Sequence, residues 1–159
     1  MAKEQIEYTR HMDLAIRQLT SHGLLVGAYD SDGKANAMTI GWGSVGSIWG
    51  IPVWIVLVRP SRYTYQCIEH TGCFTVNVPT PKMTMACATC GSKSGRDVDK
   101  FAECPLVYEC QVVHSNDVLP QKLADEILAG AYQDGDFHRV YYGKILSALA
   151  EPDAAKLLA

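Results

Sequence analysis

The sequence predicts a mainly β protein, built as a largely antiparallel barrel with short flanking helices. Short apolar runs of strand length recur along the chain, and several are joined by turns that contain Asp-Gly pairs. Helical periodicity is confined to a few short stretches. Strands connected by short turns, with helices inserted at two or three places, favour such a barrel over an alternating βαβ sheet.

The first elements follow from periodicity and turn residues. Apolar residues recur every three to four positions over 12–19, which predicts an amphipathic helix that ends at His22-Gly23. A strand over 23–29 and a tight turn at Asp32-Gly33 come next. The strand predicted over 35–43 has large and small residues on opposite sides, namely Asn36, Met38, Ile40 and Trp42 against Ala35, Ala37, Thr39 and Gly41.

The second half contains shorter elements. The apolar run 53–58 predicts a strand, followed by a helix over 62–70 and a strand over 73–78 that Pro79 and Pro81 end. A short helix, a glycine-serine loop at 91–95 and a second short helix begun by Ser94-x-x-Asp97 are expected next. Three further strands are predicted over 106–113, 122–132 and 139–149, with Asp134-Gly135 as the last hairpin turn.

Length and composition limit the possible classes of protein. The chain of 159 residues, 48% hydrophobic and 19% charged, predicts a single domain over 1–159. A net charge of -3 without a lysine-rich stripe argues against a nucleic-acid partner, which requires a basic face.

The sequence also bears on the compartment. The first ten residues carry charge without an apolar core, so we expect no secretory signal and a cytoplasmic protein. The longest apolar stretch, 48–58, is interrupted by Gly50 and Pro52 and is shorter than the roughly 20 residues of a membrane span, so no membrane partner is expected. The six cysteines are then expected to be thiols.

Two short motifs resemble functional sites but also have an ordinary structural explanation. "GWGSVG" at 41–46 matches the dinucleotide-binding pattern, but Gly50 and Pro52 follow where that motif needs a helix, so we interpret the match as coincidental. Cys87 and Cys90 have the spacing of a redox dithiol or of half a zinc site. Buried, chemically incidental thiols explain the same pair, and the sequence leaves these alternatives open.

The stretch "RPSRYTY" at 59–65 has the features of an anion site. Pro60 forces Arg59 into an extended conformation, and Ser61 can cap the following helix. A helix N-terminus with nearby arginines and hydroxyl groups favours a phosphate, although a capped helix with solvated arginines is an ordinary alternative. Combined with the small side of the strand at 35–43, which a flat ligand could approach, the stretch indicates a mononucleotide-like cofactor.

Four segments, in this order, resemble the flavin reductase-like family and especially its flavoredoxin branch: "NAMTIGWGSVG", "RPSRYTYQCIEHTGCFTVNVP", "CGSKSGRDVDKF" and "HRVYYGKIL". The resemblance covers about residues 24–145 and implies a Greek-key split β-barrel that binds FMN. It also implies a homodimer with FMN near the interface, in which the cofactor supplies the redox chemistry.

The resemblance assigns roles to individual residues. The flavin ring is expected against the backbone of Ala37, Met38, Thr39 and Ile40, with the Asn36 side chain nearby. The phosphate and ribityl chain are expected at Arg59, Ser61, Arg62, Tyr63 and Thr64. The loop contributes Cys90, Gly91, Ser92 and Ser94, with Lys100 as a second cation. His138 is expected either to orient a hydride donor or to be an interfacial imidazole without a catalytic role.

These features predict an FMN-dependent oxidoreductase that passes hydride or electrons through bound FMN to an acceptor. The donor is expected to be NADH or NADPH, bound transiently, or a redox protein partner. One alternative is an FMN-binding electron carrier without turnover of its own. Another is a thiol or metal protein that uses the cysteine pairs.

Overall fold

The computed structural model describes residues 2–97 and 104–159. The described strands form one eight-stranded sheet whose pairings are all antiparallel, in the order β3-β2-β6-β7-β8-β5-β4, with β1 added to β8. The strands are β1 Glu4–Ile6, β2 Leu24–Tyr29, β3 Ala35–Ile40, β4 Gly43–Ile48, β5 Ile51–Val58, β6 Cys73–Val78, β7 Leu106–Asp117 and β8 Arg139–Ala150. The predicted mainly β, split-barrel class is confirmed.

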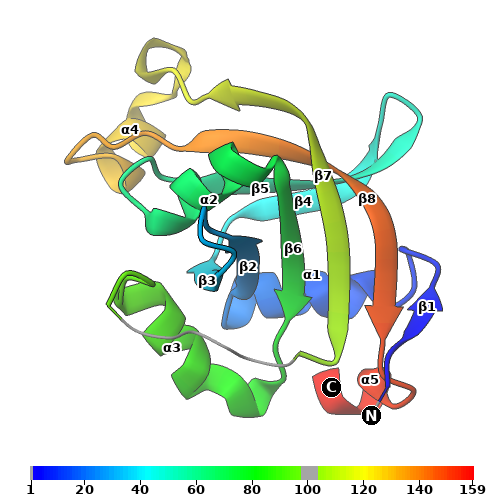
Figure 1. The fold of residues 1–159 in the computed structure, drawn as a ribbon. Coiled ribbons are helices and arrows are strands. Elements are labelled where there is room, and N and C mark those ends of the chain that lie inside the picture. Colours follow the sequence, from blue (N-terminus) through cyan, green and yellow to red (C-terminus); the bar gives the residue numbers. More distant parts are fainter. Residues whose placement is uncertain (1, 98–103) are drawn as a thin grey trace.

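Short helices occupy the connections and the C-terminal end of the described chain (Figure 1). They are α1 Met12–Ser21, α2 Tyr63–Thr71, η1 Pro81–Met83, α3 Thr84–Ser92, η2 Pro120–Lys122, α4 Asp125–Ala131 and α5 Ala154–Leu158. No helix in the described ranges has the length and apolar character needed to cross a membrane.

The curved sheet encloses the main core. The long strands β7 and β8 pair along most of their lengths, with register shifts between Glu109 and Cys110 and between Val112 and His114. Such irregularities increase local bending of a strand. Trp54, Tyr108 and Tyr141 are fully buried in this core, and α1 packs against it through Ala15 and Leu19.

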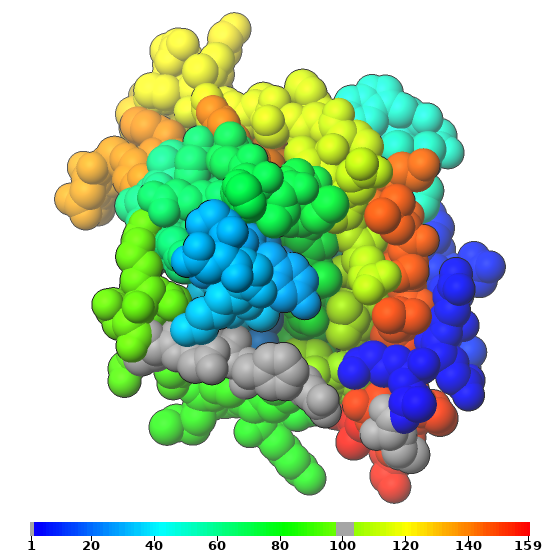
Figure 2. All heavy atoms as spheres, in the orientation of Figure 1, coloured from blue at the N-terminus to red at the C-terminus, as the bar shows by residue number. Residues whose placement is uncertain are grey.

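The connections on either side of β6 position the site. Helix α2 follows β5 and α3 lies between β6 and β7, and both contact β3. Strand β3 lies at the end of the strand order and, among the described strands, pairs only with β2. One edge of β3 is therefore left without a strand partner beside two helices. Figure 2 shows the tip of the β2–β3 hairpin at the surface next to α2.

Two predictions for the second half of the chain were wrong. Residues 122–132 run from the end of η2 through α4 instead of forming a strand, because the run rich in alanine and leucine favours a helix and places Asp125 and Glu126 in its first turn. Asp134 and Gly135 belong to the loop between α4 and β8, so they do not form a hairpin turn. Gly135 still adopts the left-handed conformation, with φ 74°.

Strand β4 was not predicted, because its sequence "GSVGSI" has low strand propensity. Its pairing with β5 through a Trp49-Gly50 turn stabilises it, and both turn residues have positive φ angles of 55° and 73°. Because a strand begins at Gly43, the rejection of "GWGSVG" as a dinucleotide motif is confirmed. Strand β1 and helix α5 also lacked a sequence signal. The predicted second short helix falls largely on residues 98–103, outside the described residues.

Candidate functional site

A pocket of about 360 Å³ lies between β3, the N-terminus of α2, the C-terminus of α3 and the segment 93–97 that follows it. It brings together most of the residues predicted to bind a cofactor: Asn36, Met38, Thr39, Ser61, Arg62, Tyr63, Thr64, Cys90, Gly91, Ser92 and Ser94. Lys100 lies outside the described residues. The loop was predicted to begin at residue 91, but α3 continues to Ser92. Three sequence segments thus converge on one polar pocket, and their role in binding a cofactor stays a prediction.

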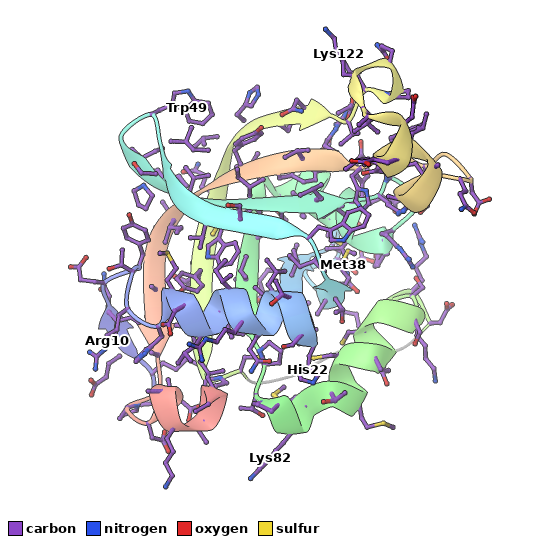
Figure 3. All side chains as sticks on the ribbon, turned by 180° about the vertical axis from the view of Figure 1, so that it is seen from behind. Arg10, His22, Met38, Trp49, Lys82 and Lys122 are labelled. Carbon is purple, nitrogen blue, oxygen red and sulfur yellow. The ribbon has the colours of Figure 1, made fainter. Side chains whose placement is uncertain are left out.

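A smaller cavity of about 180 Å³ shares Met38, Thr39 and Arg62 with the first. It adds Ile40, Arg59 and His138 from the predicted set, together with Trp42. Met38, which Figure 3 labels, belongs to β3 and packs against the main core. The two cavities therefore adjoin along β3 and provide one elongated space with a polar end and an aromatic end.

The N-terminus of α2 forms the polar end. Its N-cap is Arg62, in an extended conformation, and no described side chain makes a capping hydrogen bond. Ser61 was predicted to be the cap, and that prediction was wrong. The first-turn amides of a helix without a side-chain cap, together with the helix dipole, favour an anion, and Arg62 is placed to add its charge.

The hydroxyl of Ser61 already forms a hydrogen bond with Asp136. Ser61 Oγ donates to Asp136 Oδ2 at 2.5 Å, and the Ser61 amide donates to Asp136 Oδ1 at 3.4 Å. Asp136 has a positive φ of 56°, so the loop before β8 adopts an uncommon backbone conformation to make this contact. A bound phosphate would compete with this carboxylate for Ser61.

The Arg59 side chain also donates hydrogen bonds to the segment between α4 and β8 and to the last residue of α4. Its Nη2 donates to the carbonyl oxygen of Ala131 at 2.9 Å, and its Nη1 donates to those of Asp136 at 3.1 Å and Gly135 at 3.3 Å. The two arginines of "RPSR" therefore differ in their surroundings. Arg59 holds the loop after α4, whereas Arg62 lines both cavities.

Asn36 connects the two walls of the pocket. Its Nδ2 donates to Thr64 Oγ1 at 2.7 Å, which joins β3 to the first turn of α2. The Asn36 side chain is 5% exposed, and its Oδ1 has no hydrogen-bond partner among the described residues. A buried polar atom without a partner costs about 1–3 kcal/mol. Gly95 lies against this oxygen, because a Cβ atom added at residue 95 would overlap it.

Helix α3 packs against part of the small side of β3. Ala37 packs against the buried cluster of Cys87, Cys90 and Cys104, and Thr39 Oγ1 donates to the carbonyl oxygen of Cys87 at 2.5 Å. Thr39 nevertheless lines both cavities. The expectation that a flat ligand lies on this side stays a prediction.

The cysteine cluster has the character of a packed interior. Cys87, Cys90 and Cys104 are all buried beside Leu25, and the cysteines form no disulfide. Burial raises the pKa of the Cys87 thiol and raises the pKa of the Cys104 thiol to about 12. Within the described residues, no group of His, Cys, Asp or Glu side chains is arranged to hold a metal ion. The geometry favours protonated thiols that pack against β3.

His138 forms the aromatic end of the space with Trp42. The imidazole is 8% exposed, its Nδ1 lies 2.8 Å from Tyr132 Oη, and its ring centre lies 5.0 Å from that of Trp42. Burial, the charge of Arg59 and the charge of Arg62 together lower the pKa of His138 to about 4, although Asp136 opposes them. The imidazole is therefore neutral near pH 7.

Sequence reasoning missed several residues that line the space. Trp42 is 45% exposed and flanks the smaller cavity, although large aromatic residues are more often core. Lys93, Arg96 and Asp97 line the larger pocket. The guanidinium of Arg96 lies 4.5 Å from the ring centre of Tyr63. The only signal for Arg96 was a basic residue directly after a glycine-serine loop.

Comparison with known proteins identifies the family. The sequence model described as "Flavin reductase like domain" matches residues 16–158. The chain belongs to this family. None of the curated proteins matched it.

Solved structures of the same fold support the assignment to the flavin reductase-like family. Flavoredoxin from Methanosarcina acetivorans is 29% identical with a TM-score of 0.66, over 83% of this chain and 70% of that chain. An FMN-binding protein from Thermus thermophilus is 18% identical with a TM-score of 0.65, over 82% and 71%. An NADH:FAD oxidoreductase from Streptomyces globisporus C-1027 is 17% identical with a TM-score of 0.60, over 94% and 88%.

We expect His138 to make stability dependent on pH in mildly acidic solution. The unfolded chain binds a proton at this residue near pH 6.5 and the folded chain only near pH 4. The free energy of unfolding should therefore fall as the pH is lowered from about 6.5 to 4. Urea unfolding across this range should show a shallower dependence in His138→Gln than in the wild type. Parallel curves would contradict the neutral imidazole.

Proposed function

We propose that this chain is an FMN-dependent oxidoreductase that passes hydride or electrons through bound FMN to an acceptor. The observation that carries the proposal is the uncapped N-terminus of α2, which lines one pocket together with Arg62. Both suit a phosphate. Membership of the flavin reductase-like family supports a flavin as the ligand that carries this phosphate.

The residues present fit FMN in order along the pocket. Arg62, Tyr63 and Thr64 would hold the phosphate at the start of α2, with Ser92 at the end of α3 and Ser94 just after it on the facing side. Asn36 would meet the ribityl chain. The backbone of Met38 to Ile40 would face the ring, which would extend toward the smaller cavity. Bound FMN supplies the capacity to accept a hydride or electrons.

The chain's own residues would orient the donor and limit water at the aromatic end. Trp42 is partly exposed and flat, so it offers a surface on which a nicotinamide ring could stack. The neutral His138 presents a ring without charge, held by Tyr132, which suits it to positioning rather than to proton donation as imidazolium. A structural neighbour named as an NADH:FAD oxidoreductase supports a nicotinamide donor.

Anaerobic reduction tests the proposal. The purified protein is loaded with FMN and mixed with NADH or NADPH while the flavin absorbance is followed, and we expect bleaching with at least one of them. If FMN binds but neither nicotinamide bleaches it, the chain is an electron carrier reduced by a protein partner. If FMN does not bind, the flavin assignment itself is wrong.

We expect Arg62→Ala to weaken binding of FMN much more than binding of riboflavin, which lacks the phosphate. Loss of a charge-assisted contact to a phosphate should reduce the FMN affinity by roughly tenfold to a hundredfold. Quenching of flavin fluorescence measures both affinities. Arg17→Ala, which removes the same charge from an exposed position on α1, is the matched control and should change neither. An equal loss for both flavins would place the phosphate elsewhere.

We further propose that the chain forms a homodimer. A mostly apolar groove of about 470 Å³ lies on the outer side of β2, β6 and β7. Tyr29 and Leu146 line it and are 60% and 55% exposed. Such an exposed apolar surface is typical of a protein interface. Light scattering should show a dimer that Leu146→Glu converts to a monomer, whereas Ile127→Glu on α4 leaves it intact. A monomeric wild type would refute the dimer.

A further inference from the structure

A buried hydrogen bond joins Tyr132 to His138 at the aromatic end of the space. Both side chains are buried, and Tyr132 Oη lies 2.8 Å from His138 Nδ1. Tyr132 directly follows α4, and His138 directly precedes β8. The bond therefore connects the two ends of the segment between α4 and β8, and it does so beside the smaller cavity, which His138 lines.

Two neighbours hold the Tyr132 ring in place. Phe137 stacks on it, with ring centres 4.8 Å apart and an interplanar angle of 26°. The guanidinium carbon of Arg59 lies 5.3 Å from the centre of the same ring. Arg59 also donates to the carbonyl oxygen of Ala131, the residue before Tyr132. The phenol is thus oriented toward His138 by contacts with both its ring and the adjacent backbone.

The surroundings of Tyr132 Oη set the direction of this hydrogen bond. Burial raises the pKa of Tyr132, although the charge of Arg59 and the nearby backbone N–H of His138 lower it, so the phenol keeps its proton near pH 7. Among the described residues, that proton has no acceptor other than His138 Nδ1. The reverse direction would leave a buried hydroxyl proton without a partner. The Tyr132 hydroxyl therefore donates to Nδ1.

The imidazole proton must then lie on the other ring nitrogen. His138 is neutral near pH 7, because burial and the nearby arginines lower its pKa to about 4. A neutral imidazole carries one N–H, and Nδ1 is already used as an acceptor, so the proton is on Nε2. Nε2 makes no hydrogen bond to the described residues, and it is not one of their enclosed polar atoms without a partner. It is therefore accessible from the cavity that His138 lines.

We propose that Tyr132 is a positioning residue, which fixes His138 as the Nε2–H tautomer and so presents one neutral N–H donor to the smaller cavity. The proposal rests on the proposed function and deepens it. In such an oxidoreductase the acceptor of this N–H is a carbonyl oxygen, either of the carboxamide of a nicotinamide or of the flavin ring. Trp42, whose ring centre lies 5.0 Å from that of His138, gives a planar group of this kind a surface to lie against.

Nitrogen NMR of the apoprotein tests the tautomer without any flavin. In protein labelled with ¹⁵N-histidine, the ring signals that disappear in His138→Gln belong to residue 138. We expect the chemical shift of an unprotonated nitrogen at Nδ1 and of a protonated nitrogen at Nε2, both unchanged between about pH 6 and 8. Because this measurement uses the wild type, it decides the tautomer even if a variant is unstable.

The variant Tyr132→Phe should release the imidazole from this single tautomer. We expect a mixture of the two tautomers and a titration midpoint above about 4, because the phenol no longer stabilises the neutral ring. The other charged groups that face His138, which are Arg59, Arg62 and Asp136, are the same in both proteins. Tyr142→Phe is the matched control, since Tyr142 follows the buried Tyr141 on β8 and points to the opposite face of the strand. It should change neither quantity.

The rate of flavin reduction shows whether a ligand uses the fixed N–H. In FMN-loaded protein, Tyr132→Phe should slow anaerobic reduction by the nicotinamide, or weaken FMN binding, by up to about tenfold, since one hydrogen bond is no longer directed. In a His138→Ala background the same substitution should have no further effect, because Tyr132 acts through the imidazole. A raised half-saturating concentration of nicotinamide with unchanged FMN affinity assigns the carbonyl to the donor. A lowered FMN affinity assigns it to the flavin.

Each remaining outcome overturns a definite part of the proposal. A proton on Nδ1 in the wild type, or an unchanged tautomer and midpoint in Tyr132→Phe, would overturn the role of Tyr132. A changed tautomer with unchanged reduction and FMN affinity would overturn the use of the N–H by a ligand. Equal effects of Tyr132→Phe with and without His138 would show a purely structural role. A chain that binds no flavin would instead overturn the proposed function, and the NMR result on the apoprotein would still decide the tautomer.

Discussion

The candidate site depends on one buried hydrogen bond between the side chains of Asn36 and Thr64. It joins the edge strand β3 to the first turn of α2, two elements that are 28 residues apart in the chain. Together with the hydrogen bond from Tyr63 Oη to Asp30 Oδ2, this bond fixes the separation between the uncapped helix N-terminus and the strand edge. The bond uses the donor of Asn36 and leaves its Oδ1 without a partner among the described residues.

The charged side chains around the site have different partners, depending on where they lie in the chain. Arg59 is the residue after β5, and its guanidinium is used to hold the loop that precedes β8. Arg62 is the N-cap of α2 and lines both cavities. The same loop contributes Asp136, whose carboxylate accepts a hydrogen bond from Ser61 at the edge of the pocket. A phosphate bound at the N-terminus of α2 would therefore lie beside a carboxylate, whose repulsion Arg62 and the helix N-terminus would have to outweigh.

Much of the fold could be predicted from the sequence, because its signals are local. The period-2 run of β3, the glycine after α1 and the prolines after β6 each define an element or its end without tertiary information. The failures came where tertiary pairing decides. Strand β4 is held by its neighbour β5 despite two glycines, and 122–132 was too apolar to be distinguished from a strand by pattern alone.

The residues that line the site could be predicted from the sequence better than the contacts that their side chains make. The segments that line the larger pocket were identified from "NAMTIGW", "RPSRYTY" and the glycine-serine loop, yet the roles of individual side chains were not. Whether Ser61 caps a helix or binds Asp136 depends on a loop 75 residues away. How much of the small side of β3 is open depends on α3, whose Cys87 and Cys90 pack with Ala37. A local sequence pattern does not indicate which distant residue a side chain will contact.

The packing of β3 has a physical consequence for the site. The thiols of α3 pack with Ala37 on one side of the strand, and Ile40 is buried in the main core on the other. The strand that lines both cavities is therefore packed on both faces. Groups that are ordered before binding lose little conformational entropy when a ligand arrives. The buried thiol cluster thus contributes to the site by packing against the strand that lines it.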